Sequence, residues 1–267
     1  MLKVGIVGCG AMGQIIAKKI EEGLKGIKLV ALCDKEKKRA EKLASVLTHP
    51  PVVVDLPSLI SASDVVVEAT SFEAAPQIVI ESLNKGRDVL VLTVGAIFKR
   101  SDIFKLAQDK QVKIYLPSGA IAGLDWLKAA SLGKISQLTL VTRKPVGGLE
   151  ETPYLKQAKI NIANIENEVV LFEGTVEEAI KNFPANINIA ATLALAAGEA
   201  ARVKVKIVAD PKLTKNIHQI KAEGELGKIN LSVENLPSQI NPRSSKLAAF
   251  SALALLEEIA SPVKIGT

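Results

Sequence analysis

Short, mostly apolar runs alternate with amphipathic stretches through the first half of the chain. The apolar runs lie at residues 3–7, 28–33, 52–54, 65–69, 88–92 and 112–116. Helical spacing of apolar residues separates most of them, near residues 37–47, 72–85 and 101–110. Apolar runs without alternation are typical of strands buried on both faces, so we expect a parallel, doubly wound α/β sheet over residues 1–118.

The pattern changes after about residue 118. Polar and apolar positions alternate in several candidate strands, near residues 138–142, 168–172, 203–208, 217–220 and 229–233. Alternation indicates a sheet with one buried face and one solvated or helix-covered face. A run of small residues at 187–201 predicts a helix among these strands. We therefore expect a second, α+β domain of mostly antiparallel sheet over residues 119–239, which binds the substrate and contributes a dimer interface.

The C-terminal stretch is apolar at helical spacing over residues 244–259 and predicts a long helix. An apolar helix needs a surface to cover, and the first domain offers one. We expect residues 240–267 to pack back on that domain.

A glycine-rich turn follows the first apolar run directly. It reads Gly8-Cys9-Gly10-Ala11-Met12-Gly13 and opens an amphipathic helix. In such a unit the first glycine permits the tight turn, the second lets a pyrophosphate approach the backbone, and the third lets helix and strand pack closely. The N–H groups and the positive dipole end of the helix then hold the phosphates. We interpret the first domain as a Rossmann-type dinucleotide-binding domain; the alternative is a turn that only packs a βαβ unit.

Asp34 ends the second apolar run about 20 residues beyond the turn, where a carboxylate binds the ribose 2′-hydroxyl of NAD. Basic residues follow at Lys35, Lys37, Lys38 and Arg39, and they could accommodate the 2′-phosphate of NADP. We expect NAD to be the preferred cofactor and NADP to be accepted.

Ligands of open parallel sheets lie beyond the carboxyl ends of the strands, at the point where the strand order reverses. This rule marks the glycine turn, residues 68–71 and residues 93–96. Thr70 and Ser71 have two interpretations here. They hydrogen-bond the cofactor, or they cap the helix that follows.

Composition narrows the class of protein. Of the 267 residues 48% are hydrophobic and only 3% are aromatic, which predicts a mainly aliphatic core. The net charge of +6 permits a nucleic-acid partner, but acidic residues interleave with the basic ones and no aromatic side chains accompany them. We expect anionic small molecules instead of nucleic acid. The two cysteines, Cys9 and Cys33, have no companions at metal-ligand spacing, so no metal is expected, and they fit a reducing compartment.

No apolar run approaches the ~20 residues of a membrane span, and the printed chain begins directly with a strand pattern instead of a signal peptide. We expect a cytoplasmic protein without a membrane partner.

The chain contains two histidines. His49 precedes two prolines in an expected surface loop and is given no role. His218 lies in the second domain, where a strand-surface position and a catalytic one are both open. Histidine suits proton transfer near neutral pH, so His218 is the leading candidate for a general base. Arg243 and Lys246, at the start of the last helix, could hold a substrate carboxylate, although Ser244 would make the same segment an ordinary helix cap.

Four segments together resemble the L-aspartate dehydrogenase family, over the whole length of the chain. They are the glycine turn and residues 116–125 (LPSGAIAGLD), 183–192 (FPANINIAAT) and 241–245 (NPRSS). The resemblance implies NAD(P)-dependent oxidative deamination of L-aspartate to iminoaspartate, which is hydrolysed to oxaloacetate and ammonium. It also implies that His218 is the catalytic histidine and that Ala122 and Asn188 contact the cofactor. A homodimer, and a hand-off of the imine to quinolinate synthase for NAD biosynthesis, are further implications.

Other function classes remain open at this point. A related two-domain reductase could act on another small acid, of the homoserine or dihydrodipicolinate type, because fold does not determine function. A dinucleotide sensor would bind NAD without any hydride transfer. A nucleic-acid binder would show salt-sensitive DNA binding.

Overall fold

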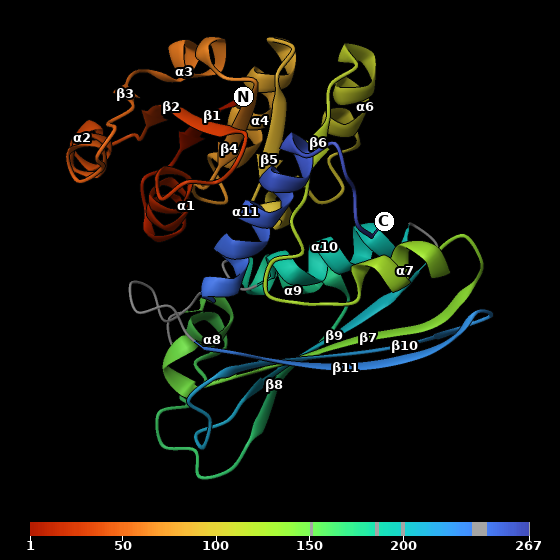
Figure 1. The fold of residues 1–267 in the computed structure, drawn as a ribbon. Coiled ribbons are helices and arrows are strands. Elements are labelled where there is room, and N and C mark those ends of the chain that lie inside the picture. Colours follow the sequence, from red (N-terminus) through yellow and green to blue (C-terminus); the bar gives the residue numbers. More distant parts are fainter. Residues whose placement is uncertain (150–151, 185–186, 199–200, 237–244, 267) are drawn as a thin grey trace. The chain divides into compact units, whose positions relative to one another are not determined.

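The chain forms two compact units in the computed structural model, which describes residues 1–149, 152–184, 187–198, 201–236 and 245–266 (Figure 1). The first unit comprises residues 1–119 together with residues 248–265. The second unit comprises residues 120–247 and the C-terminal residues from 266 onward.

A six-stranded parallel sheet forms the centre of the first unit, in the order β3-β2-β1-β4-β5-β6. Its strands are β1 (Leu2–Val7), β2 (Ile27–Cys33), β3 (Val52–Val53), β4 (Val65–Glu68), β5 (Asp88–Val91) and β6 (Ile114–Tyr115). The order reverses between β1 and β4, which is the doubly wound arrangement of dinucleotide-binding domains. The predicted Rossmann-type sheet is therefore confirmed.

Helices cover both faces of this sheet. They are α1 (Ala11–Glu21), α2 (Lys37–Ser45), α3 (Leu56–Ala62), α4 (Ala75–Asn84), α5 (Val94–Ile97), α6 (Ser101–Lys110) and α11 (Lys246–Ala260). One buried cluster packs α1, α2 and α11 against one face through residues such as Ile16, Leu43 and Leu253. Two further clusters pack α3, α4, α5 and α6 against the other face. Strands buried on both faces need apolar residues at every position, which explains why their runs show no alternation.

A five-stranded sheet forms the second unit, in the order β11-β10-β7-β9-β8. Its strands are β7 (Ile135–Lys144), β8 (Val169–Gly174), β9 (Val203–Ala209), β10 (Asn216–Gly224) and β11 (Gly227–Asn235). Three of the neighbouring pairs are antiparallel and the β7–β9 pair is parallel. The expected, mostly antiparallel sheet is confirmed, with one parallel pair that alternation alone does not reveal.

Helices line one face of this second sheet (Figure 1). They are α7 (Leu124–Ala130), α9 (Val176–Asn182) and α10 (Asn188–Ala197). The short η1 (Val146–Gly148) and α8 (Pro153–Ala158) follow β7 along the chain. The other face is polar, with ion pairs such as Lys206 to Glu173 at 2.9 Å and Lys228 to Glu223 at 3.4 Å.

The apolar pattern of the sequence did not predict several short elements. Helices α3, α5, α7, α8 and α9 have only four to seven residues, too few turns to show a helical period. The helices expected at 72–85 and 187–201 are the shorter α4 and α10, and β6 has two residues where 112–116 were expected. Among the described residues, no helix has both the length and the apolar character needed to cross a membrane.

Candidate active site

The glycine turn between β1 and α1 has the geometry that a dinucleotide pyrophosphate needs. Gly8 has a φ of +99°, a conformation that favours glycine. A Cβ at Gly13 would lie 1.9 Å from the Gly8 carbonyl oxygen, so only glycine lets α1 pack this closely against the turn. A Cβ at Gly10 would meet nothing within 4 Å, so the space over the middle glycine is open to a ligand. Gly10 is the N-cap residue and offers no side-chain cap, so the first N–H groups of α1, which begins with Ala11 and Met12, suit phosphate oxygens.

Asp34 reaches back from the end of β2 to this turn. Its Oδ2 accepts a hydrogen bond from the Cys9 N–H at 2.7 Å, and its Oδ1 accepts one from the Glu36 N–H at 2.9 Å. A carboxylate offers about four lone-pair sites, so Asp34 can anchor the turn and still accept a hydrogen bond from a ribose hydroxyl. Together the turn and Asp34 fit a bound dinucleotide.

Both cysteines are held in the thiol form. Burial, with a smaller contribution from the Asp34 carboxylate, raises the pKa of Cys9 to about 12. The same two causes raise the pKa of Cys33. The thiolate is the nucleophile and the metal ligand, so neither residue suits covalent or metal chemistry. Throughout the described ranges, no group of three or more His, Cys, Asp and Glu side chains could hold a metal ion.

Glu68 is a fully buried carboxylate at the end of β4, beside the point where the strand order reverses. It accepts hydrogen bonds from the N–H and hydroxyl of Thr70, at 2.6 and 2.7 Å, and from the N–H and hydroxyl of Thr93, at 3.0 and 2.9 Å. Glu68 therefore ties together the loops that follow β4 and β5. The N-cap residue of α4 is Ala74, with no side-chain hydrogen bond, and the Thr70 hydroxyl is directed to Glu68, so Thr70 does not cap this helix. The Ser71 carbonyl accepts hydrogen bonds from the N–H groups of Ala74 and Ala75, in the turn that leads into α4.

In the second unit, the helix-covered face of the sheet is apolar at one end and polar at the other. The apolar rows across β11, β10, β7 and β9 contain Ile229, Ala222, Leu138 and Val203, then Leu231, Ile220, Leu140 and Val205. The third row contains Val233, His218, Thr142 and Ile207, and continuing the same registers aligns Asn235, Asn216, Lys144 and Ala209. His218 is only 4% exposed, so the strand-surface interpretation of this histidine is excluded.

His218 lies in a cluster with Thr142 and Lys144. Its Nδ1 is 3.2 Å from Oγ1 of Thr142. Burial, and to a smaller extent the positive charge of Lys144, lower the pKa of His218 to about 3. Lys144 is itself buried, which lowers its pKa to about 8. At neutral pH the imidazole is therefore neutral but only weakly basic, whereas the Lys144 amine is mostly protonated.

The sequence pattern did not single out Lys144, although a signal was present. The expected strand ended at Thr142, whereas β7 continues to Lys144. Extending the alternation of Leu138, Leu140 and Thr142 by one step places Lys144 on the buried face. Lysine is almost never fully buried without a partner or a role, so an inward lysine on a predicted strand marks a candidate site residue.

The two residues that the resemblance assigns to cofactor contact lie in the second unit. Ala122 is exposed in the loop before α7, and Asn188 is the first residue of α10. Nδ2 of Asn235 donates a hydrogen bond to the Ala120 carbonyl at 2.9 Å. Since Asn235 pairs with Asn216 at the polar end of the sheet, this bond ties the Ala122 loop to the end that carries His218.

Of the two candidate substrate-binding cations, the structure describes only one. Arg243 and the neighbouring Ser244 lie outside the described residues. Lys246 is exposed at the first position of α11. Beside it, the buried Ser245 accepts a hydrogen bond from the Leu247 N–H at 3.1 Å, which is the capping contact that was expected of Ser244.

Both units match families of known proteins. The family model described as aspartate dehydrogenase, C-terminal, matches residues 125–259, and that described as homoserine dehydrogenase, NAD binding domain, matches residues 8–117. The L-aspartate dehydrogenases of Methanosarcina barkeri and Methanosarcina acetivorans are 44% and 46% identical over 271 residues, covering all of both chains in each case.

Solved structures agree with this assignment. The aspartate dehydrogenase of Thermotoga maritima superposes with a TM-score of 0.73 at 27% identity and full coverage of both chains. A homoserine dehydrogenase of Thiobacillus denitrificans shares the fold, with a TM-score of 0.63 at 15% identity over 97% of this chain and 73% of that one. Dinucleotide-binding domains serve many activities, so the match of the second unit and the full-length identity are the specific findings. The chain belongs to the L-aspartate dehydrogenase family, whose members are NAD(P)-dependent oxidoreductases.

Proposed function

We propose that this protein catalyses the NAD(P)-dependent oxidative deamination of L-aspartate to iminoaspartate, which water converts to oxaloacetate and ammonium. One observation carries the proposal: the chain combines a dinucleotide turn with a buried His218–Thr142–Lys144 cluster in the unit that matches aspartate dehydrogenases. The cluster supplies a neutral imidazole and a positive charge, which a dicarboxylic amino acid requires.

The cofactor supplies the hydride acceptor for the substrate Cα. The chain's own part is to hold it. The turn from Gly8 to Gly13 binds the pyrophosphate and Asp34 binds the ribose. Thr70, Ala122 and Asn188 are proposed as further contacts, the last two on the family resemblance alone.

His218 is proposed as the group that takes the proton. In the tautomer whose Nδ1–H donates to Thr142, Nε2 presents its lone pair to the substrate. Nε2 then accepts a proton from the aspartate ammonium before hydride transfer and releases it to solvent. The neutral imidazole can afterwards accept a second proton, from the water that attacks the imine.

Lys144 is proposed as the cationic partner of one substrate carboxylate. A carboxylate bound beside Lys144 offsets the effect of the ammonium on the imidazole, and this raises the pKa of His218. The base thus becomes stronger when the substrate is present. Arg243 and Lys246 are the candidates for the second carboxylate.

The formation of reduced nicotinamide, followed by absorbance, tests the activity. Purified protein and NAD are mixed with one amino acid at a time: L-aspartate, L-glutamate or L-homoserine. We expect turnover with L-aspartate alone. Turnover with L-homoserine instead would favour the homoserine dehydrogenase alternative. NAD binding without turnover on any of the three would favour a sensor.

The cellular location, the oligomeric state and the next enzyme in the reaction sequence are proposed on the family resemblance. We propose a cytoplasmic homodimer that passes iminoaspartate to quinolinate synthase, because an imine released into water is lost by hydrolysis. Light scattering of the purified protein tests the dimer, and a mass equal to one chain would refute it. Faster quinolinate formation with this enzyme than with an equal rate of free imine supply would support the hand-off.

A further inference from the structure

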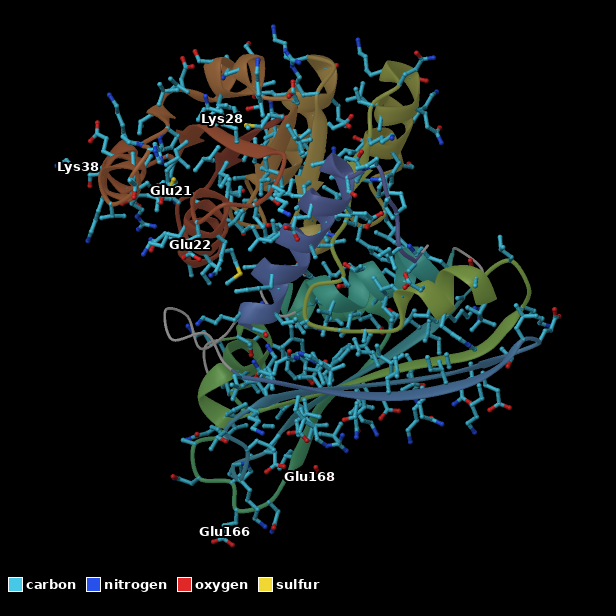
Figure 2. The ribbon with its side chains drawn as sticks, viewed as in Figure 1. Glu21, Glu22, Lys28, Lys38, Glu166 and Glu168 are labelled. Atoms are coloured by element: carbon cyan, nitrogen blue, oxygen red, sulfur yellow. The ribbon has the colours of Figure 1, made fainter. Side chains whose placement is uncertain are left out.

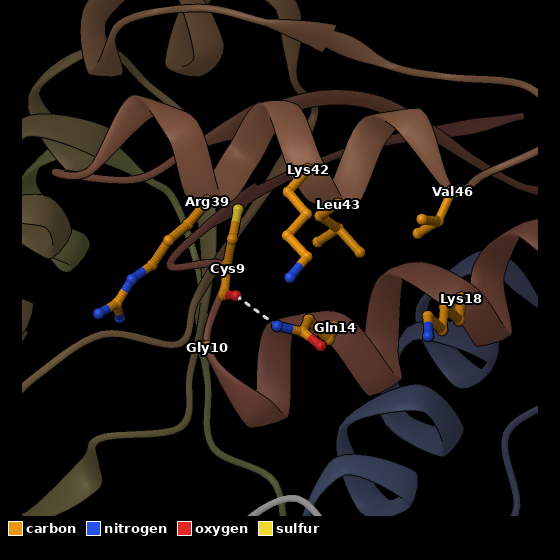
Figure 3. A pocket seen from close by; sticks show the side chains of 8 residues that line it. All are labelled: Cys9, Gly10, Gln14, Lys18, Arg39, Lys42, Leu43 and Val46. Atoms are coloured by element: carbon orange, nitrogen blue, oxygen red, sulfur yellow. Dashed lines mark hydrogen bonds between the residues drawn. The ribbon is translucent and has the colours of Figure 1, made fainter.

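A pocket of about 350 Å³ opens between α1 and α2 in the first unit, beside the glycine turn (Figure 3). The turn contributes Cys9 and Gly10 to its lining. Helix α1 contributes Gln14 and Lys18, and helix α2 contributes Arg39 and Lys42. Leu43 of α2 and Val46, directly after this helix, complete the lining, and none of the lining residues is acidic. Such a pocket favours an anion.

Two lysines are the strongest candidates to bind that anion. Lys42 is directed from α2 toward Gln14 on α1 (Figure 3), whose Nε2 donates to the Cys9 carbonyl at 3.1 Å. Within the ranges that the structure describes, neither Lys18 nor Lys42 forms an ion pair. Arg39, in contrast, is paired with Glu36 at 2.9 Å, so much of its charge is already compensated.

The position of the pocket bears on which anion it could take. Its wall includes the Cys9–Gly10 backbone of the pyrophosphate turn, and the Cys9 N–H is bound by Asp34. In the proposed function Asp34 faces the adenosine ribose, so a substituent on that ribose lies next to the pocket. A phosphate monoester there would carry up to two negative charges, which complement the two lysines.

We propose that this pocket receives the 2′-phosphate of NADP, with Lys42 and Lys18 as its cationic partners. The proposal rests on the dinucleotide binding of the proposed function and adds the residues that decide between NADP and NAD. It also revises the sequence-based expectation, because of Lys35, Lys37, Lys38 and Arg39 only Arg39 lines the pocket.

Binding of nucleotide fragments to the full chain tests the proposal without turnover. Calorimetry at constant ionic strength compares 2′,5′-ADP with 5′-AMP. We expect 2′,5′-ADP to bind more tightly to the unaltered protein, which would reverse the expectation from the sequence that NAD is the preferred cofactor. Lys42→Met should lower that affinity about tenfold, the usual effect of losing one charge-assisted hydrogen bond, and should leave 5′-AMP binding unchanged. Lys18→Met should act in the same direction.

Lys38→Met is the matched control, since it removes the same charge from the same helix outside the pocket. Lys38 is exposed and projects outward from α2 (Figure 2). An equal loss of 2′,5′-ADP affinity in Lys38→Met and Lys42→Met would overturn the proposal. The effect would then come from the overall positive charge of the helix and not from a contact in the pocket. The proposal also fails if 3′,5′-ADP binds as tightly as 2′,5′-ADP, or if both pocket variants keep their affinity for 2′,5′-ADP. Retained binding of 5′-AMP in those cases would leave the proposed function standing, whereas absence of all nucleotide binding would refute both.

Discussion

His218 and Thr142 face each other across the β10–β7 ladder, with Nδ1 of the imidazole 3.2 Å from the threonine hydroxyl oxygen. Both side chains are buried. Because the partners belong to paired strands instead of loops, the ladder register itself orients the ring. The Nδ1 atom is thereby engaged, and Nε2 is the ring nitrogen that we propose for proton transfer.

Removing the threonine hydroxyl tests this orienting role. Thr142→Val keeps the shape of the side chain but leaves Nδ1 without its partner. We expect kcat to fall roughly tenfold with little change in the KM for aspartate, because a misoriented base acts mainly on the chemical step. Thr142→Ser retains the hydroxyl and should restore most of the rate. Steady-state kinetics that show an unaltered kcat in Thr142→Val would contradict the assignment.

Removing the imidazole tests the base itself. His218→Ala should lower kcat by roughly 10²–10⁴-fold, the usual contribution of general acid–base catalysis. NAD affinity should stay close to that of the unaltered protein. His49→Ala is the matched control, because the His49 side chain is 89% exposed and should not affect turnover. Near-normal turnover in His218→Ala would refute the proposed role.

Burial of neutral His218 also predicts an acid sensitivity of the fold. Below pH 6.5, the ordinary pKa of histidine, the unfolded chain gains a proton that folded His218 accepts only near its own pKa of about 3. The unfolded state therefore binds more protons in this window, and the free energy of unfolding contributed by this site falls as pH falls. Denaturant titrations at neutral pH and near pH ~4 should show a smaller pH effect in His218→Gln. An identical pH effect in both proteins would argue against a depressed pKa.

The charge of Lys144 predicts how dicarboxylates bind as pH rises. Succinate has no amino group, so its affinity reports the carboxylate partner alone. The pKa of Lys144 is lowered to about 8, so succinate inhibition should weaken as pH rises through that value and the ammonium is lost. Lys144→Arg should move the loss to higher pH, because the guanidinium stays protonated. Succinate should inhibit Lys144→Met only weakly at every pH. A wild-type inhibition profile in that variant would exclude Lys144 as the carboxylate partner.

The glycine turn offers a pair of substitutions with opposite outcomes. At Gly13 a Cβ would lie 1.9 Å from a backbone oxygen, so Gly13→Ala should lower the free energy of unfolding by at least ~1–3 kcal/mol, the usual cost of overpacking. At Gly10 the Cβ would enter open space, so Gly10→Ala should keep the stability and weaken NAD binding by occupying the place of the pyrophosphate. Thermal unfolding and NAD titration separate the two effects. Equal stability losses would show that the open space does not exist.

The sequence by itself determined the first unit in some detail. Unalternating apolar runs predicted its strands, and the spacing from Gly8 to Asp34 predicted the cofactor turn. These features rest on residues close together in the chain, where the geometry of a single βαβ unit already relates sequence to position. The sequence also predicted a strand at residues 217–220, but it left open whether His218 lies on the surface, and only the structure shows this side chain to be buried.

Only the tertiary structure decided which side chains surround His218, Asp34 and Glu68. Thr142 lies 76 positions before His218, and Thr93 lies 25 positions after Glu68. A strand's own pattern shows which of its faces is buried but not which strand lies beside it or in what register. The order β11-β10-β7-β9-β8 brings Thr142 and Lys144 to the histidine, and the packing of α2 beside α1 brings Lys42 to the turn. The sequence thus showed which single residues could act, whereas strand pairing and helix packing between distant segments decided how they combine into sites.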